Sequence, residues 1–213
     1  MNQTSPPFQV LFSNADILRR THELARELHA ALGNEPPCLI QVVEGARPFA
    51  RLLQQAFDGQ SLYDVRAKSY AGTESTGEVR VDLLGGLGRE VVDGREVVLI
   101  EDIVDTGRTI AALRQRFLEL GARGVRVASL LSKPSRRVVE VEVEHIGFEI
   151  PDQFVLGFGD LIALVPAAGY RSVELPLPSP NPIAGQLVFA AHVVLDYQLN
   201  VRGTSSPSVF VTL

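Results

Sequence analysis

The sequence predicts an α/β fold, built on a twisted and mainly parallel sheet flanked by helices. Apolar runs such as Cys38–Val43 and Val97–Ile100 are typical of strands buried on both faces of a parallel sheet. The order strand 97–100, helix 109–120, strand 125–131 forms a βαβ unit, whose strands run parallel. A chain of 213 residues, 46% of them hydrophobic, suits a single domain over 1–213 with a core of its own.

Composition narrows the class of protein. A formal net charge of -5 opposes a general nucleic-acid binder, which usually carries a basic surplus. The single cysteine, Cys38, excludes an intrachain disulfide and a cysteine-based zinc finger, and its apolar neighbours indicate a buried thiol. The segment Met1–Pro7 has no basic residue and no apolar run, so we expect no signal peptide. We therefore expect a cytoplasmic protein with neither nucleic acid nor a membrane as its partner.

The first helix is expected over Ser13–Leu32, where apolar residues recur at helical spacing. Ser13 and Asp16 can form a capping box at its start, and Gly33 follows its last turn. Each end of this helix therefore has its own signal in the sequence.

Four further elements follow before the βαβ unit. A strand over Cys38–Val43 leads to a short helix over Pro48–Ala56, with proline in its first turn. Strands are then expected over Tyr63–Ser69 and Val79–Leu84. The polar, glycine-containing segment 70–77 between them has the composition of a mobile loop.

The segment Val97–Thr109 carries the strongest chemical signal. Glu101 and Asp102 come at the carboxyl end of a buried strand, where open α/β sheets bind ligands. Two adjacent acids repel each other unless a cation or sugar hydroxyls lie between them, and hard Mg²⁺ prefers oxygen ligands. The following loop and helix start offer amides and hydroxyls for a phosphate. Asp105 lies in the same loop as a possible base.

This segment resembles the phosphoribosyl-diphosphate (PRPP) binding motif of type I phosphoribosyltransferases. The resemblance implies a small hood subdomain, built from the N-terminal segment and the region from Lys133 onward. It implies that Asp105 is catalytic, holding the purine N7 proton as the bond forms at N9, and that Mg²⁺ neutralises the departing diphosphate. It places Glu101 and Asp102 at the ribose and the metal. The residues implied at the 5′-phosphate are Thr106, Gly107, Arg108 and Thr109.

Three other segments resemble the hypoxanthine-guanine phosphoribosyltransferases in the order of that family. These are Tyr63–Tyr70 with Ser75–Gly77, Val127–Lys133 and Gly147–Gly159. The resemblance implies an enzyme of purine salvage, which transfers the 5-phosphoribosyl group from PRPP to N9 of hypoxanthine, guanine or both. The products would be IMP or GMP and diphosphate.

The same resemblance assigns the purine-side residues. Lys133 would donate a hydrogen bond to the 6-oxo group, Phe154 would stack on the ring, and the main chain of Val155 would read the ring edge. A mobile loop that includes Lys68, Ser69 and Tyr70 would close over the transition state and exclude water.

Two departures from the family stand out. Glu44, with Gly45, occupies the diphosphate loop at a place where the family often has Lys or Arg. An acid there is unfavourable unless its side chain points away or meets Mg²⁺. Loop amides would then bind the diphosphate, and Arg47 is either the replacement cation or a surface residue.

The second departure is a predicted insertion over residues 160–194, rich in proline and poor in charge. The family's metal-binding Asp then corresponds to Asp196, and its diphosphate-binding Arg to Arg202; Asp160 is the competing metal candidate. The insertion is interpreted as a proline-rich excursion, as a subunit contact, or as a translated stretch foreign to the natural protein.

Two alternatives to this enzyme remain at the sequence level. One is a PRPP-binding regulatory protein of the same fold without catalysis. The other is a phosphoribosyltransferase for another base, such as xanthine. The resemblance also implies a homodimer or homotetramer.

Overall fold

The computed structural model describes residues 9–33, 35–58, 60–69, 79–152, 155–156 and 161–164. Contacts divide the chain into two compact units, one over Leu18–Asp152 and one that joins Met1–Ile17 to Gln153–Leu213. The second unit has the make-up predicted for the small subdomain, but it starts at Gln153 and not at Lys133. The chain between these residues stays with the large unit, because it adds a strand to the large sheet.

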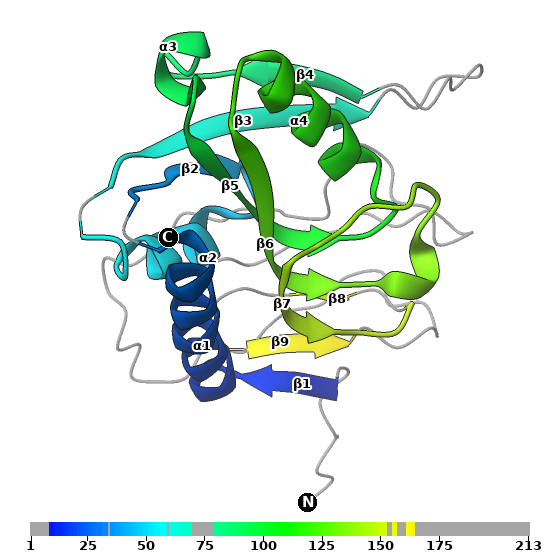
Figure 1. The fold of residues 1–213 in the computed structure, drawn as a ribbon. Coiled ribbons are helices and arrows are strands. Elements are labelled where there is room, and N and C mark those ends of the chain that lie inside the picture. Colours follow the sequence, from blue (N-terminus) through cyan, green and yellow to red (C-terminus); the bar gives the residue numbers. More distant parts are fainter. Residues whose placement is uncertain are drawn as a thin grey trace, which may run out of the picture. The chain divides into compact units, whose positions relative to one another are not determined.

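The large unit is built on a six-stranded sheet (Figure 1). Every neighbouring pair is parallel except β3 with β4, which confirms the mainly parallel sheet. Its strands in spatial order are β4 (Val79–Leu83), β3 (Leu62–Ser69), β2 (Cys38–Val42), β5 (Glu96–Val104), β6 (Gly124–Ser132) and β7 (His145–Glu149).

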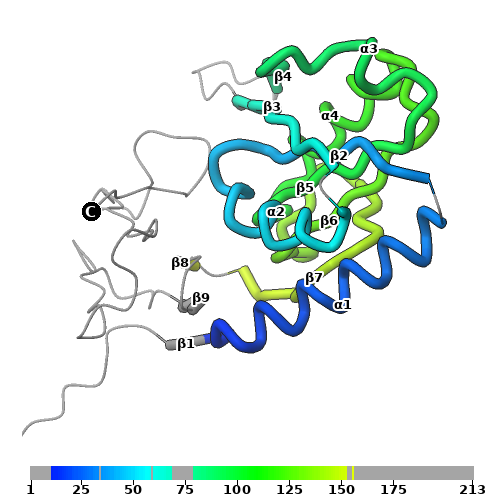
Figure 2. Tube along the Cα trace, turned by 90° about the vertical axis from the view of Figure 1, so that its left-hand side faces the viewer, coloured from blue at the N-terminus to red at the C-terminus, as the bar shows by residue number. Residues whose placement is uncertain are grey.

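Helices flank this sheet, as expected. On one face, α4 (Arg108–Glu119) buries Ile110, Leu113 and Phe117 among aliphatic side chains of β2, β5 and β6. On the other side lie α1 (Asn14–Leu32) and α2 (Arg47–Gln54) (Figure 2). A short helix, α3 (Arg89–Val92), precedes β5, and a 3₁₀ turn (Pro134–Arg136) follows β6.

The structure confirms several predictions that were made from local sequence signals. Ser13 Oγ and Asp16 Oδ2 lie 2.6 Å apart, and the Asp16 amide donates to Ser13 Oγ at 3.2 Å, which confirms the capping box. Gly33 ends α1 with φ 65. Cys38 is buried, and burial raises the pKa of its thiol to about 11.

The end of β5 was predicted wrongly. The run of aliphatic residues placed the end at Ile100, but the strand continues to Val104. Backbone pairing with β6 carries it on, and Val104 still pairs with Ser132. Glu101 and Asp102 therefore lie within the strand and not at its very end.

The small unit contains a three-stranded antiparallel sheet in the order β1, β9, β8. Its strands are β1 (Gln9–Ser13), β8 (Val155–Leu156) and β9 (Leu161–Leu164). The first residues of the predicted insertion thus form β9, and the rest of that insertion lies outside the described residues. Among the helices that the structure describes, none has the length and apolar character needed to cross a membrane.

Candidate active site

Four of the predicted site segments lie at or just after the carboxyl ends of strands that run in the same direction. Lys68 and Ser69 end β3, and Glu44 and Gly45 come just after β2. The loop from Asp105 follows β5, and Lys133 follows β6. Because β3, β2, β5 and β6 are neighbours and parallel, their carboxyl ends share one edge of the sheet. The fold therefore brings these segments together at the edge where ligands bind in open α/β sheets.

The loop between β5 and α4 is shaped for close approach. Gly107 is the N-cap of α4 and has a φ of 85°, a backbone conformation that residues other than glycine rarely adopt. A Cβ on Gly107 would lie 2.5 Å from the Val139 carbonyl oxygen. The amides of Val138 and Val139 both donate to the Thr106 carbonyl, at 3.0 and 3.1 Å. The chain after β6 thus packs tightly against this loop.

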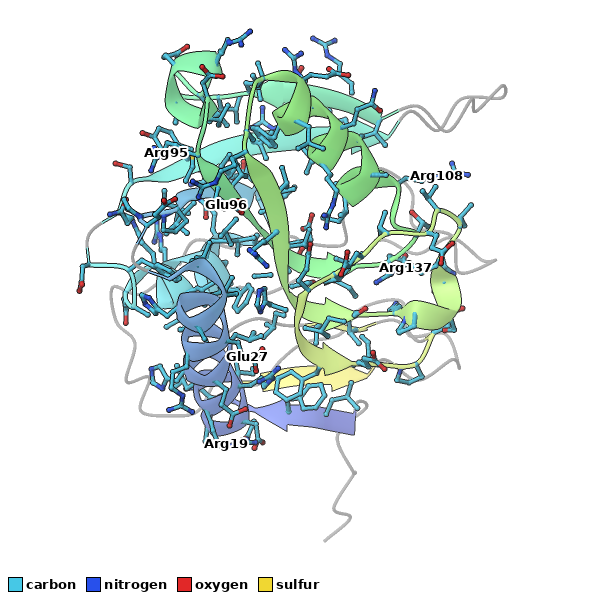
Figure 3. The ribbon with its side chains drawn as sticks, viewed as in Figure 1. Arg19, Glu27, Arg95, Glu96, Arg108 and Arg137 are labelled. Carbon is cyan, nitrogen blue, oxygen red and sulfur yellow. The ribbon has the colours of Figure 1, made fainter. Side chains whose placement is uncertain are left out.

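Arg137 joins the loop to the end of β6. Its guanidinium donates to the carbonyl of Val104 at 2.6 Å, to the carbonyl of Asp105, and to Ser132 Oγ at 2.8 Å. Arg137 and Arg108, the first residue of α4, both lie on the side where β5 and β6 end (Figure 3). Arg137 therefore fixes the backbone on which Asp105 stands.

Glu101 and Asp102 form the carboxylate pair that the sequence predicted. Glu101 is buried, whereas Asp102 is partly exposed, and the Asp102 amide donates to Glu101 Oε1 at 3.2 Å. Burial, with the neighbouring Asp102 carboxylate, holds the pKa of Glu101 well above its usual range. Such a pair is costly as two charges and becomes favourable beside a cation.

The side chain of Asp105 contacts the turn after β6. Arg136 Nε donates to Asp105 Oδ1 at 2.9 Å, and Arg136 Nη1 lies 3.5 Å from Asp152 Oδ1. Arg136 and Arg137 were not among the site residues predicted from the sequence. The basic pair three and four residues after Lys133 was the available signal.

Lys133 is buried at the end of β6, with 8% of its surface exposed. Its backbone amide donates to the Val104 carbonyl at 3.0 Å, which sets it beside the loop that carries Asp105. Burial lowers the pKa of its ammonium group, while the charges of Asp105 and Asp152 act in the opposite direction. A buried lysine is rare without a function or a partner.

Glu44 does not present an unbalanced acid to the edge of the sheet. The peptide bond between Val43 and Glu44 is cis. Arg47 Nε donates to Glu44 Oε2 at 2.8 Å, and Arg66 Nη2 donates to Glu44 Oε1 at 3.4 Å. Arg47 also donates to Asp64 Oδ2 at 2.8 Å. Two acids and two arginines thus form a network whose formal charges cancel.

The other residues predicted for the site lie outside the described residues or in the small unit. Tyr70, Phe154, Asp160, Asp196 and Arg202 lie outside the described residues. Val155 belongs to β8 in the small unit. The described residues contain no cluster of three or more groups that would hold a metal ion.

Comparisons with known proteins show which family the chain belongs to. Residues 10–162 match the family model of the phosphoribosyl transferase domain. Two curated relatives are named hypoxanthine-guanine phosphoribosyltransferase. The protein of Streptococcus agalactiae serotype V is 37% identical over 153 residues, which are 71% of this chain and 83% of the relative. The protein of Streptococcus thermophilus (strain CNRZ 1066) is 38% identical, with the same coverage.

Solved structures show the same likeness. A hypoxanthine phosphoribosyltransferase from Staphylococcus aureus superposes with a TM-score of 0.67 at 28% identity, covering 74% of this chain and 91% of that one. A hypoxanthine-guanine phosphoribosyltransferase from Bacillus anthracis, with a HEPES molecule in its active site, gives a TM-score of 0.66 at 29% identity. That match covers 74% of this chain and 98% of the other.

Proposed function

The chain belongs to the hypoxanthine-guanine phosphoribosyltransferases, and from this premise we propose how its residues carry out the transfer. The reaction joins N9 of a 6-oxopurine to C1 of the ribose and releases diphosphate, as a step of purine salvage. The observation that carries the proposal is the gathering of Lys133, the Asp105 loop and the Glu101–Asp102 pair around the ends of β5 and β6.

Asp105 is the proposed proton acceptor. As the N9–C1 bond forms, the purine must lose a proton, and the C1–oxygen bond breaks with its electrons leaving on the diphosphate. A carboxylate within reach of N7 can hold that proton. Asp105 suits the task because Arg137 and the turn after β6 fix the loop on which it stands.

The loop from Thr106 to Thr109 is the proposed 5′-phosphate site. It combines main-chain amides with two threonine hydroxyls at the start of α4, a helix of 12 residues. The amides at a helix start favour an anion. Gly107 permits the turn that this arrangement requires.

The Glu101–Asp102 pair suits the ribose hydroxyls and a Mg²⁺ ion. A buried carboxylate with a raised pKa beside a second carboxylate is a donor set that a hard cation would stabilise. When bound, Mg²⁺ would neutralise charge on the diphosphate group. Asp196 remains the further proposed ligand, with Asp160 as its competitor.

Lys133 is the proposed reader of the base. An ammonium group only donates hydrogen bonds, so it favours a 6-oxo acceptor over the 6-amino group of adenine. We propose that Phe154 stacks on the purine ring and that the main chain of Val155 reads its edge. A lid that includes Lys68, Ser69 and Tyr70 would close over the transition state. A preference among hypoxanthine, guanine and xanthine depends on contacts at the purine 2-position.

At the diphosphate we propose Gly45, Arg202 and Glu44. Of these, Glu44 forms ion pairs with Arg47 and Arg66. From the sequence we also propose a single domain over 1–213 with an insertion over 160–194. We further propose a cytoplasmic location and a homodimer or homotetramer.

The test is an assay of the purified chain with PRPP and Mg²⁺. Hypoxanthine, guanine, xanthine, adenine and orotate are offered separately, and nucleotide and diphosphate are both quantified. Nucleotide formed from hypoxanthine or guanine in a one-to-one ratio with diphosphate supports the proposal. Turnover of xanthine alone would assign another base, and PRPP binding without any turnover would favour the regulatory alternative. The Asp105→Asn variant, which keeps the side-chain shape and removes the charge, should lose turnover and keep PRPP affinity.

A further inference from the structure

Arg136 stands between two carboxylates at the edge of the sheet. Its Nε donates to Asp105 Oδ1 at 2.9 Å, and its Nη1 lies 3.5 Å from Asp152 Oδ1. Its backbone is fixed as well, because its amide donates to the Lys133 carbonyl at 3.0 Å. One side chain therefore connects the loop after β5 with the chain that leads out of the large unit.

This contact restricts the orientation of the Asp105 carboxylate. Asp105 is partly exposed, and an aspartate in such a loop has several rotamers open to it. A hydrogen bond between charged groups selects the rotamer that meets the guanidinium. Arg136 occupies Oδ1 and leaves Oδ2 to meet a purine.

Asp152 restricts Arg136 in turn. A long arginine side chain with 43% of its surface exposed could extend into solvent, but the second carboxylate gives it a partner on its other side. Asp152 directly precedes the segment in which Phe154 and Val155 are proposed to hold the ring. The arginine thus bridges the proposed proton acceptor and the start of the proposed purine segment.

We propose that Arg136 is a positioning residue for the transfer, holding the Asp105 carboxylate so that its second oxygen faces the proton at purine N7. The inference rests on the proposed role of Asp105. Arg136 itself touches no reacting atom, so it acts on the reaction only through Asp105.

The experiment compares Arg136→Gln, Arg136→Lys, Asp105→Asn and the double variant Arg136→Gln/Asp105→Asn, using kcat and the KM for each substrate. We expect Arg136→Gln to lower kcat about five-fold, a modest loss because the ion pair is partly exposed, with the KM for PRPP unchanged. Arg136→Lys keeps the charge and should recover part of the loss. The matched control is Arg116→Gln on α4, since Arg116 is equally exposed at 44% and is paired with Glu119.

The double variant separates positioning from general structural support. If Arg136 acts through Asp105, Arg136→Gln costs no further activity once Asp105 is Asn. An equal loss in both backgrounds, or an unchanged kcat, would overturn the inference. If Arg136→Gln does not fold, Asp152→Asn replaces it and should lower kcat about two-fold in the wild-type background only. An unchanged kcat for Asp105→Asn alone would refute the role of Asp105, and the inference with it.

Discussion

Replacing Gly107 by alanine tests the tight packing between the loop after β5 and the chain after β6. Gly107 has φ 85, and an added Cβ would lie 2.5 Å from the Val139 carbonyl oxygen and 3.0 Å from Val141 Cγ2. Real Cβ atoms do not approach backbone atoms at 2.5 Å. The loop must therefore move away from Val139, and the effect combines backbone strain with lost hydrogen bonds.

The magnitude follows from these two parts. An alanine in the left-handed region costs about 1 kcal/mol relative to glycine. Moving the loop breaks the bonds from Val138 and Val139 to the Thr106 carbonyl, and each contributes about 1 kcal/mol. We expect the variant to lose about 3 kcal/mol of stability, which in a chain of this size lowers Tm by roughly 6–12 °C.

The matched control is Gly86→Ala. Gly86 has a similar φ of 81, but a Cβ there would meet nothing within 4 Å. This variant therefore carries the backbone strain alone and should lose about 1 kcal/mol. Thermal unfolding of both variants, with calorimetric titration of PRPP, separates strain from collision. For Gly107→Ala we also expect PRPP affinity to fall about ten-fold, since the proposed phosphate loop loses the shape that binding requires.

Equal unfolding temperatures for the two variants would refute the collision argument. Normal PRPP affinity in a folded Gly107→Ala protein would show that the loop does not bind the phosphate.

Three further predictions concern buried ionisable groups. Lys133→Met should raise the KM for hypoxanthine about ten-fold and leave the KM for PRPP unchanged. Equal increases in both KM values would contradict a hydrogen bond from Lys133 to the purine. Because the pKa of Glu101 is raised, the native state holds a proton that the unfolded chain releases, so stability falls as pH rises above about 4.5. Glu101→Gln should flatten this slope in metal-free unfolding, and Mg²⁺ should stabilise the wild type more than the variant. Burial lowers the pKa of His145, so stability falls as pH drops below about 6.5, and His145→Gln should reduce this acid sensitivity.

The sequence predicted the central elements well because their signals are local. The capping box of α1, the proline in the first turn of α2 and the apolar runs of β2 and β5 each depend on a few neighbouring residues. Strand β7 and the small sheet were missed because pairing between distant segments creates them. The end of β5 was wrong for the same reason, since β6 extends it past two acids.

The candidate site divides in the same way. The carboxylate pair, the proposed phosphate loop and Lys133 form recognisable patterns in the sequence, and parallel strands bring them to one edge. Arg136 and Arg66 were not predicted, because their roles depend on ion pairs with residues 31 and 22 positions away. Arg47 was left open between a diphosphate cation and a surface residue, and the structure shows it paired with two acids.

The network around Glu44 has a consequence for affinity at the proposed diphosphate site. A lysine at this position would attract diphosphate from solution, whereas Glu44 and Asp64 already neutralise Arg47 and Arg66. A loop with balanced charges holds a multiply charged leaving group less strongly. The same loop would hold the diphosphate group of PRPP and the free product, so easier product release would be accompanied by weaker substrate binding. Glutamate in place of the family's lysine would therefore change how strongly the enzyme holds PRPP and diphosphate, and would leave the equilibrium between base and nucleotide unchanged.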